Sequence, residues 1–191
     1  MPKRKQPKPV QIALPKSMMV SLALLLGFAS GYFYYEQNLP QVFSVEDKTP
    51  TYNVCFSPEG QCEKLAIHAI DSAKSELLVQ SYSFTSKPIA NALIQAHKRG
   101  VKVSLLFDQS QLKAPYSQVH RLKQNGIHTK VDYVEGIAHN KVIIIDGERL
   151  VTGSYNFSKA ANSRNAENMI YINNPDLART YKQKWIERYK K

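Results

Sequence analysis

Along residues 61–189, short apolar runs rich in β-branched residues alternate with longer stretches in which apolar residues recur every three or four positions. The short runs are typical of β-strands, and they occupy residues 76–84, 101–107, 128–131, 141–145, 150–152 and 168–172. The longer stretches predict helices over residues 61–75, 117–125 and 175–189, and one more that Thr85 or Ser86 caps and that ends before Gly100. Strands that alternate with helices indicate an α/β sandwich, in which helices flank a mixed β-sheet. The pattern leaves the order of the strands open.

The N-terminal residues follow a different pattern. Residues 1–16 form a basic tail, and residues 17–35 carry no charge and end in four consecutive aromatic residues. As a helix, these nineteen residues span about 30 Å, which predicts a transmembrane anchor. Basic residues before the anchor place the following domain on the far side of the membrane. The alternative is a signal peptide cleaved near residues 29–31, and both readings export the domain.

Residues 36–52 contain two prolines and read as a linker, which leaves residues 53–191 as one catalytic domain. The net charge of +11 includes five basic residues of the tail, so +6 belongs to the rest of the chain. A basic domain suits a polyanionic partner such as nucleic acid or an anionic lipid surface. Charge alone does not separate that reading from a basic surface without a partner.

Two cysteines, Cys55 and Cys62, flank the turn-forming residues 57–60. A turn there can bring the two sulfur atoms within bridging reach, and an oxidising compartment would close the disulfide. Two free buried thiols are the alternative, whereas a zinc site lacks the second pair of ligands. The cysteines therefore agree with export of the domain.

Residues 138–168 hold the side chains that carry chemistry. His139 and Lys141 are two apart, so on a strand they share one face, and so do Ser154 and Asn156. Lys141 offers a compact cation to a phosphate oxygen, while Ser154 and Asn156 can donate further hydrogen bonds. An imidazole can attack phosphorus if a carboxylate holds its other nitrogen. The set predicts phosphoryl transfer, with Lys141, Ser154 and Asn156 binding the substrate phosphate.

The spacing His-x-Lys, four residues, Asp, six residues, Gly-Ser-x-Asn resembles the motif of the phospholipase D superfamily, and the flanking residues resemble its small single-motif bacterial endonucleases. The resemblance implies a phospholipase D-like fold over the whole domain. It implies that His139 is the nucleophile and that Glu167 is the carboxylate that orients it. Asp146 is the fourth residue of the predicted catalytic set, with His139, Lys141 and Glu167. It lies beside a turn, where we expect it to orient the strand ends.

A histidine that is bound to phosphorus cannot also protonate the leaving oxygen, so the reaction needs a second acid. The chain contains one motif. The resemblance therefore implies a homodimer in which two copies of His139 face each other across a twofold axis. Lys141 supplies the positive charge, so we expect a metal-independent reaction without a cofactor.

Three functions remain open. The first is a non-specific endonuclease that cleaves DNA or RNA, held at a bacterial inner membrane with its domain in the periplasm, or released there by signal cleavage. The second is a membrane-associated phospholipase D or cardiolipin hydrolase, which an apolar rim around the cleft would favour. The third is a non-catalytic component for nucleic-acid binding or uptake, for which a nucleophilic histidine has no use.

Several other residues are candidates for minor roles. Lys113 and Tyr116 lie on a polar loop after Asp108 and are conceivable contacts for a nucleic-acid strand, although an ordinary solvated loop has the same composition. The remaining four histidines lack a comparable context, and we expect them to be structural or surface residues. They are His68, His97, His120 and His128.

Overall fold

The computed structural model describes residues 15–37 and 51–191. The chain divides into two compact units, Met1–Ser44 and Val45–Lys191, of which the second holds the sheet. The basic tail predicted for residues 1–16 and the linker predicted for residues 36–52 lie almost wholly outside the described residues.

The described part of the first unit is helix α1 (Lys16–Gln37), which contains the predicted anchor. Serine and glycine interrupt its leucine-rich run, and the hydroxyl of Ser30 donates a hydrogen bond to the carbonyl of Leu26 at 2.8 Å. Across residues 15–37 and 51–191, no helix is both long enough and apolar enough to cross a membrane. The helix was predicted correctly, but its transmembrane character is not confirmed.

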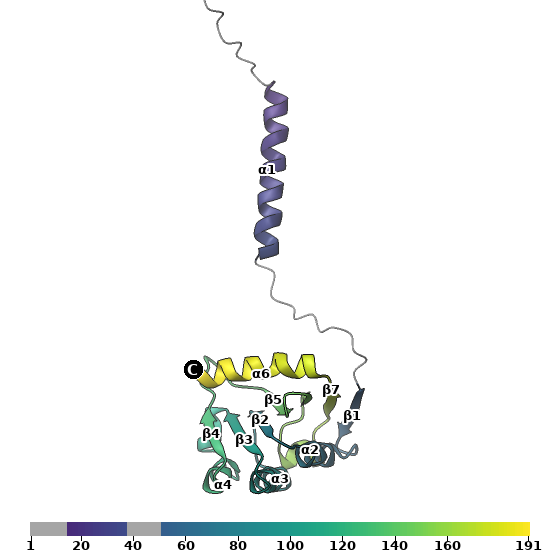
Figure 1. Cartoon of the computed structure of the whole chain (residues 1–191), viewed down its shortest axis with the longest axis vertical. Coiled ribbons are helices and arrows are strands. Elements are labelled where there is room, and N and C mark those ends of the chain that lie inside the picture. The colour runs from purple at the N-terminus through teal and green to yellow at the C-terminus, as the bar shows by residue number, and fades with distance from the viewer. Residues whose placement is uncertain (1–14, 38–50) are drawn as a thin grey trace, which may run out of the picture. The chain divides into compact units, whose positions relative to one another are not determined.

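The second unit is built on a seven-stranded mixed sheet (Figure 1). The strand order is β1-β7-β6-β5-β2-β3-β4, with β2, β3 and β4 parallel to one another and every other neighbouring pair antiparallel. The strands are β1 (Thr51–Ser57), β2 (Glu76–Ser81), β3 (Lys102–Phe107), β4 (His128–Val131), β5 (Lys141–Ile145), β6 (Arg149–Gly153) and β7 (Glu167–Asn173).

Helices cover both faces of the sheet, as predicted (Figure 1). On one face lies α6, and on the other lie α2, α3 and α4. Their bounds, with those of the short α5 and of a 3₁₀ turn, are α2 (Cys62–Asp71), α3 (Lys87–Lys98), η1 (Gln109–Leu112), α4 (Val119–Gln124), α5 (Lys159–Ser163) and α6 (Pro175–Lys190). This arrangement is the predicted α/β sandwich.

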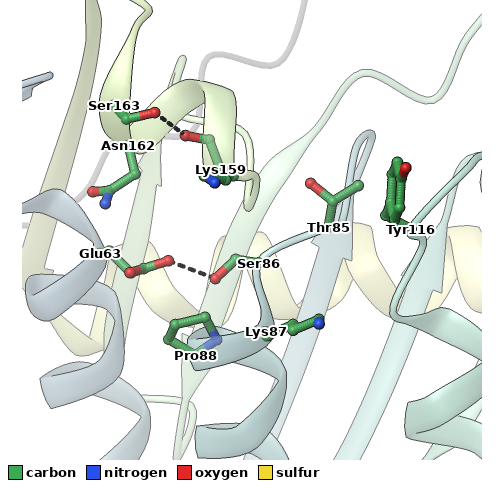
Figure 2. Close-up of a pocket in the computed structure, with 9 residues that line it drawn as sticks. All are labelled: Glu63, Thr85, Ser86, Lys87, Pro88, Tyr116, Lys159, Asn162 and Ser163. Atoms are coloured by element: carbon green, nitrogen blue, oxygen red, sulfur yellow. Dashed lines mark hydrogen bonds between the residues drawn. The ribbon is translucent and has the colours of Figure 1, made fainter.

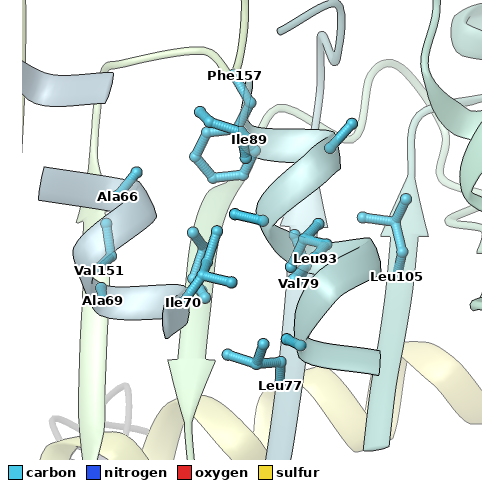
Figure 3. Packing of buried hydrophobic residues seen from close by; sticks show 14 of the residues in the cluster. Ala66, Ala69, Ile70, Leu77, Val79, Ile89, Leu93, Leu105, Val151 and Phe157 are labelled. Atoms are coloured by element: carbon cyan, nitrogen blue, oxygen red, sulfur yellow. The ribbon is translucent and has the colours of Figure 1, made fainter. Parts of the chain in front are cut away.

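Each face of the sheet has its own apolar core. In the larger core, Ile70 of α2 and Leu93 of α3 pack over Val79 of β2 (Figure 3). In the smaller core, Trp185 of α6 packs against Leu78 and Ile144. The indole Nε1 of Trp185 also donates a hydrogen bond to the carbonyl of Val79 at 3.0 Å. Successive residues of a strand face opposite sides, so β2 and β5 feed both cores and contain mainly apolar residues.

Local signals explain where the elements begin. Ser86 caps α3 as predicted, because its hydroxyl accepts a hydrogen bond from the backbone N–H of Ile89 at 3.2 Å. The predicted bounds of the strands at 128–131 and 141–145 agree with β4 and β5. Strand β1 was missed, because its first residues were assigned to the linker. The disulfide between Cys55 and Cys62 is confirmed, with the two Cα atoms 5.5 Å apart.

Candidate active site

All the predicted catalytic residues except Asp146 gather at one edge of the sheet, where the parallel strands β2, β3 and β4 end. Lys141 opens β5 and pairs with Ser81, the last residue of β2. Ser154 directly follows β6, and Glu167 opens β7. His139 stands two residues before β5. Because β5, β6 and β7 pair in antiparallel fashion, the start of β5, the end of β6 and the start of β7 lie at the same edge. Residues up to 28 positions apart in the sequence meet there.

His139 is exposed and lies against an aromatic ring. The ring centroids of His139 and Tyr82 are 4.6 Å apart, with the planes inclined by 56°. The Nζ atom of Lys141 lies 5.2 Å from the centroid of Tyr82 and donates a hydrogen bond to the carbonyl of His139 at 2.6 Å. Lys141 thus fixes the backbone at the histidine and leaves the imidazole accessible.

Lys141 is 5% exposed. Burial lowers the pKa of its ammonium group, because the charged form loses hydration, and the nearby negative charge of Glu167 raises this pKa part of the way back. Lys141 therefore carries a desolvated cation, which interacts more strongly with a phosphate oxygen than an exposed one does.

Glu167 and Ser154 form the second half of the site. The hydroxyl of Ser154 donates a hydrogen bond to Oε2 of Glu167 at 2.7 Å, and Asn165 Nδ2 donates to Oε1 at 3.0 Å. Glu167 was predicted to hold His139. Among the described residues, the hydrogen bonds of its carboxylate go to Ser154 and Asn165, and its charge acts on Lys141.

Asn156 lies two residues after Ser154. Its Oδ1 atom is buried and has no hydrogen-bond partner among the described residues. Buried polar atoms are almost always paired, so an unpaired one beside a site points to a missing partner.

Asp108 was not predicted as a site residue. It follows β3, is 2% exposed, and accepts a hydrogen bond from the backbone N–H of Ala138 at 2.8 Å. Burial raises the pKa of Asp108, but hydrogen bonds from Ser110 and Ala138 and the charge of nearby His139 outweigh it, so this pKa lies below its ordinary value. A carboxylate directly after a buried parallel strand was the signal that could have found it.

A second anchor holds the other end of the loop that leads to His139. Asp132 is buried and accepts hydrogen bonds from Nε of Arg188 at 2.8 Å and from Nε2 of Gln80 at 3.0 Å. Arg188 belongs to the last turn of α6. Residues 132–138 are therefore fastened at both ends, once to α6 and once to Asp108.

Asp146 lies at the opposite end of β5, about 16 Å of strand away from Lys141. Its carboxylate accepts hydrogen bonds from the backbone N–H groups of Lys74, Ser75 and Glu76. Burial raises the pKa of Asp146, but these hydrogen bonds outweigh it and lower the pKa to about 2. The structure places Asp146 apart from the other site residues, where it joins β5 to the start of β2.

The residues predicted to have minor roles lie in different parts of the domain. Tyr116 lines a pocket beside the site, and Lys113 is exposed outside that lining. His68, His120 and His128 are exposed, and His97 is half-buried in α3. All four histidines lie outside the group that contains His139.

The family model described as "Cardiolipin synthase, PLD-like domain" matches residues 66–189, and the matched stretch contains the whole site. The chain belongs to the phospholipase D superfamily. The similarity extends to complete members: "Phospholipase D" of Rickettsia felis is 40% identical over 190 residues, which cover 91% of this chain and 95% of the relative.

Two further members of the superfamily differ in their names. The crystal structure of Nuc from Salmonella typhimurium, a phospholipase D family member, superposes with a TM-score of 0.71 at 39% identity, over 74% of this chain and 95% of Nuc. "Mitochondrial cardiolipin hydrolase" of Xenopus laevis is 30% identical over 181 residues, which are 89% of this chain and 85% of the relative. The chain is thus a phosphodiesterase of the phospholipase D superfamily.

Proposed function

We propose that this protein is a metal-independent endonuclease that cleaves DNA or RNA through a phosphohistidine intermediate. The observation that carries the proposal is an exposed imidazole directly beside a buried ammonium group. His139 is exposed and therefore accessible to a substrate. Lys141, two residues away, carries a positive charge that is largely shielded from water. This pair supplies a nucleophile and a cation for the equatorial phosphate oxygens, which are the main requirements of phosphoryl transfer.

In the proposed reaction, a ring nitrogen of His139 attacks phosphorus and forms an N–P bond while the P–O bond to the leaving strand breaks. Lys141, with Ser154 and Asn156, stabilises the charge on the remaining oxygens. The unpaired Oδ1 of Asn156 supports this role, because exchanging the two amide atoms of Asn156 would place a donor at this position. Glu167 holds Ser154 in place and acts on Lys141 through its charge.

The leaving oxygen requires a proton that the first histidine cannot give. We assign this proton to His139 of a second copy, in a homodimer whose twofold axis passes through the site. The same second histidine then removes a proton from water, whose oxygen attacks phosphorus and releases the first histidine. The exposure of His139 at the sheet edge supports this arrangement, because a buried histidine could not face another chain.

Nucleic acid is favoured as the substrate by the charge around the site. Four exposed basic side chains stand on segments that connect the strands at this edge, and a polyanionic strand would neutralise them. They are Lys87, Lys113, Lys159 and Arg164. The resemblance of residues 53–189 to small endonucleases points the same way.

A membrane-associated phospholipase or cardiolipin hydrolase is the second candidate, and one observation favours it. Tyr133 and Ile137, on the loop that leads to His139, are 65% and 59% exposed. Exposed apolar side chains near His139 suit acyl chains, and relatives named phospholipase D and cardiolipin hydrolase share the family. A second copy of the chain could cover the same side chains.

We also propose that the domain works in an oxidising compartment such as the bacterial periplasm. The Cys55–Cys62 disulfide supports this location, because such bonds persist where thiols are not kept reduced.

The whole chain and its His139→Ala variant would be incubated in a chelator with DNA, RNA and cardiolipin-containing vesicles. We expect the parent to cleave nucleic acid and the variant to lose at least a thousandfold in rate while keeping its circular dichroism spectrum, because His139 is exposed. Cleavage of lipid alone would reverse the choice of substrate. Mixed dimers of parent and His139→Ala chains test the dimer, because the shared site then keeps only one of its two histidines. We expect such mixed dimers to be as inactive as the variant alone, and half of the parent's activity would contradict a shared site.

A further inference from the structure

A pocket of about 680 Å³ opens beside the active site (Figure 2). A cavity of this size lies within the range that binds small ligands. Its lining comes from the start of α3, from the loop before α4, from α2 and from α5. The residues used below are Glu63, Thr85, Lys87, Tyr116, Lys159 and Asn162.

The pocket and the site share a wall. The backbone N–H groups of Thr85 and Ser86 both donate to the carbonyl of Phe157 at 2.9 Å, and Phe157 directly follows Asn156. Behind this wall, Tyr155 donates a hydrogen bond to Asn162 of the pocket lining at 3.2 Å. The pocket lining is therefore hydrogen-bonded to the two residues that flank Asn156 of the site, Tyr155 and Phe157.

One side of the pocket is an exposed aromatic ring, Tyr116, which stands across the opening from Lys159 (Figure 2). Tyr116 is 83% exposed, and its φ of 64° is a backbone conformation that a bulky residue rarely adopts. Gln118 holds it there, since its Nε2 atom donates to the carbonyl of Tyr116 at 3.0 Å and its backbone N–H donates to Phe84. An exposed ring kept in a strained conformation by a buried partner indicates a function for the ring.

Two lysines give the pocket its charge. Lys87 and Lys159 are both exposed, and neither forms an ion pair with another described residue. The acidic residue of the lining is Glu63, whose Oε1 atom already accepts a hydrogen bond from the hydroxyl of Ser86 at 2.6 Å. Positive charge therefore exceeds negative charge in the pocket, which favours an anionic ligand.

We propose that this pocket is a subsite for the nucleotide next to the scissile phosphate of a single-stranded nucleic acid. Lys87 and Lys159 bind its phosphate, and its base stacks on Tyr116. A base can stack on an aromatic side chain only when it is unpaired, so the subsite selects single strands over duplexes. The inference deepens the proposed endonuclease function and rests on it for the identity of the polymer.

A measurement of binding affinity tests this inference independently of catalysis. The whole chain with His139→Ala would be titrated into a fluorescein-labelled single-stranded oligonucleotide of about ten nucleotides, alone and combined with changes in the pocket. Tyr116→Ala should weaken binding about tenfold, while Tyr116→Phe, which keeps the ring, should not weaken it. Lys87→Ala and Lys159→Ala should each weaken binding about fivefold and reduce the slope of log affinity against log salt by about 0.7.

Two controls accompany the titration. Lys98→Ala removes the same charge from the other end of α3 and should leave affinity unchanged. With His139 intact, the pocket variants should hydrolyse bis(p-nitrophenyl) phosphate, a diester without neighbouring nucleotides, within twofold of the parent. Unchanged oligonucleotide affinity in all three alanine variants would overturn the subsite. Equal losses on the small diester would overturn it too, since they would mean damage to the catalytic site.

The two proposals also fail differently. If the parent hydrolyses the small diester and binds the oligonucleotide through the pocket but cuts no nucleic acid, the endonuclease function is wrong and the subsite stands. If it cuts single strands with the same KM in every pocket variant, the function stands and the subsite is wrong.

Discussion

The carboxylate of Asp108 and the backbone N–H of Ala138 are joined by a hydrogen bond of 2.8 Å, one residue before the exposed imidazole of His139. Asp108 itself is held by the backbone N–H of Ser110 at 2.9 Å. Asp108 is thus a positioning residue, which acts on His139 through the backbone. A nucleophile that lies ahead of a strand, outside its ladder of hydrogen bonds, needs such a support to keep its distance from phosphorus.

Asp108→Ala should therefore lower kcat about tenfold for bis(p-nitrophenyl) phosphate while KM stays nearly constant, because Lys141 still binds the phosphate. The lost hydrogen bonds to a charged group should also cost about 2 kcal/mol of stability. Asp108→Asn keeps one acceptor oxygen and should lie between the parent and the alanine variant in kcat. A folded Asp108→Ala protein with the parent's kcat would contradict the positioning role.

Asp146→Asn should separate stability from catalysis within the motif. The folded pKa of Asp146, about 2, lies below the ordinary value of 3.8, so its stabilising contribution is complete above about pH 4 and is lost as the pH falls toward 2. That difference corresponds to roughly 2 kcal/mol. Urea unfolding at several pH values should show the variant less stable by this amount at pH 5 and equal to the parent near pH 2. Its kcat at neutral pH should be unchanged, and a large loss of kcat in a folded variant would place Asp146 in catalysis.

The alkaline side of the pH–rate profile should report Lys141. Its cation is needed to bind phosphate, and burial lowers its pKa, so kcat/KM should fall at a lower pH than an ordinary lysine would give. Glu167→Gln removes the negative charge that raises this pKa and should move the fall to still lower pH. Lys141→Arg, which stays charged, should be less active but lack the alkaline fall. An alkaline limb that Glu167→Gln leaves in place would show that another group titrates there.

The Cys55–Cys62 disulfide should stabilise the domain by about 2.5 kcal/mol, which is the value that loop closure gives for a separation of seven residues. Urea unfolding with and without reductant measures this contribution. The double variant Cys55→Ser, Cys62→Ser should match the reduced parent and not respond to reductant. Parent protein with the same midpoint in both conditions would mean that the bond adds no stability.

The sequence predicted the sandwich well because buried strands carry a clear apolar signal. Residues 141–145 are five apolar or site residues in a row and became the central strand β5. Strand β1 was missed because Tyr52, Val54 and Phe56 are exposed on an edge strand, so their pattern differs little from that of a linker. Helix α5 was missed because five residues are too few to show a helical period.

Part of the candidate site could be predicted from the sequence, but the hydrogen bonds between its residues could not. His139, Lys141, Ser154 and Glu167 lie at one edge because each stands at, or within two residues of, the end of β5, β6 or β7 at that edge. The partner of Glu167 depends on how β7 pairs with β6, because that register places Ser154 beside Asn168. The role of Asp108 depends on the path of residues 132–138, which no periodicity records. The partner of Glu167 and the role of Asp108 both depend on contacts between segments that are distant in the sequence. A local sequence pattern contains no information on such contacts.

The hydrogen bonds between Arg188 and Asp132 also tie the site to the order in which the chain is made. Synthesis proceeds from the N-terminus, and His139 leaves the ribosome well before Arg188 does. Until residue 188 has been added, Asp132 lacks its guanidinium and the smaller core lacks Trp185. The loop that carries the nucleophile then has one anchor where the finished protein has two. A growing chain therefore contains His139 before the loop in front of it has both anchors, so the site is fully supported only after residue 188 has been added.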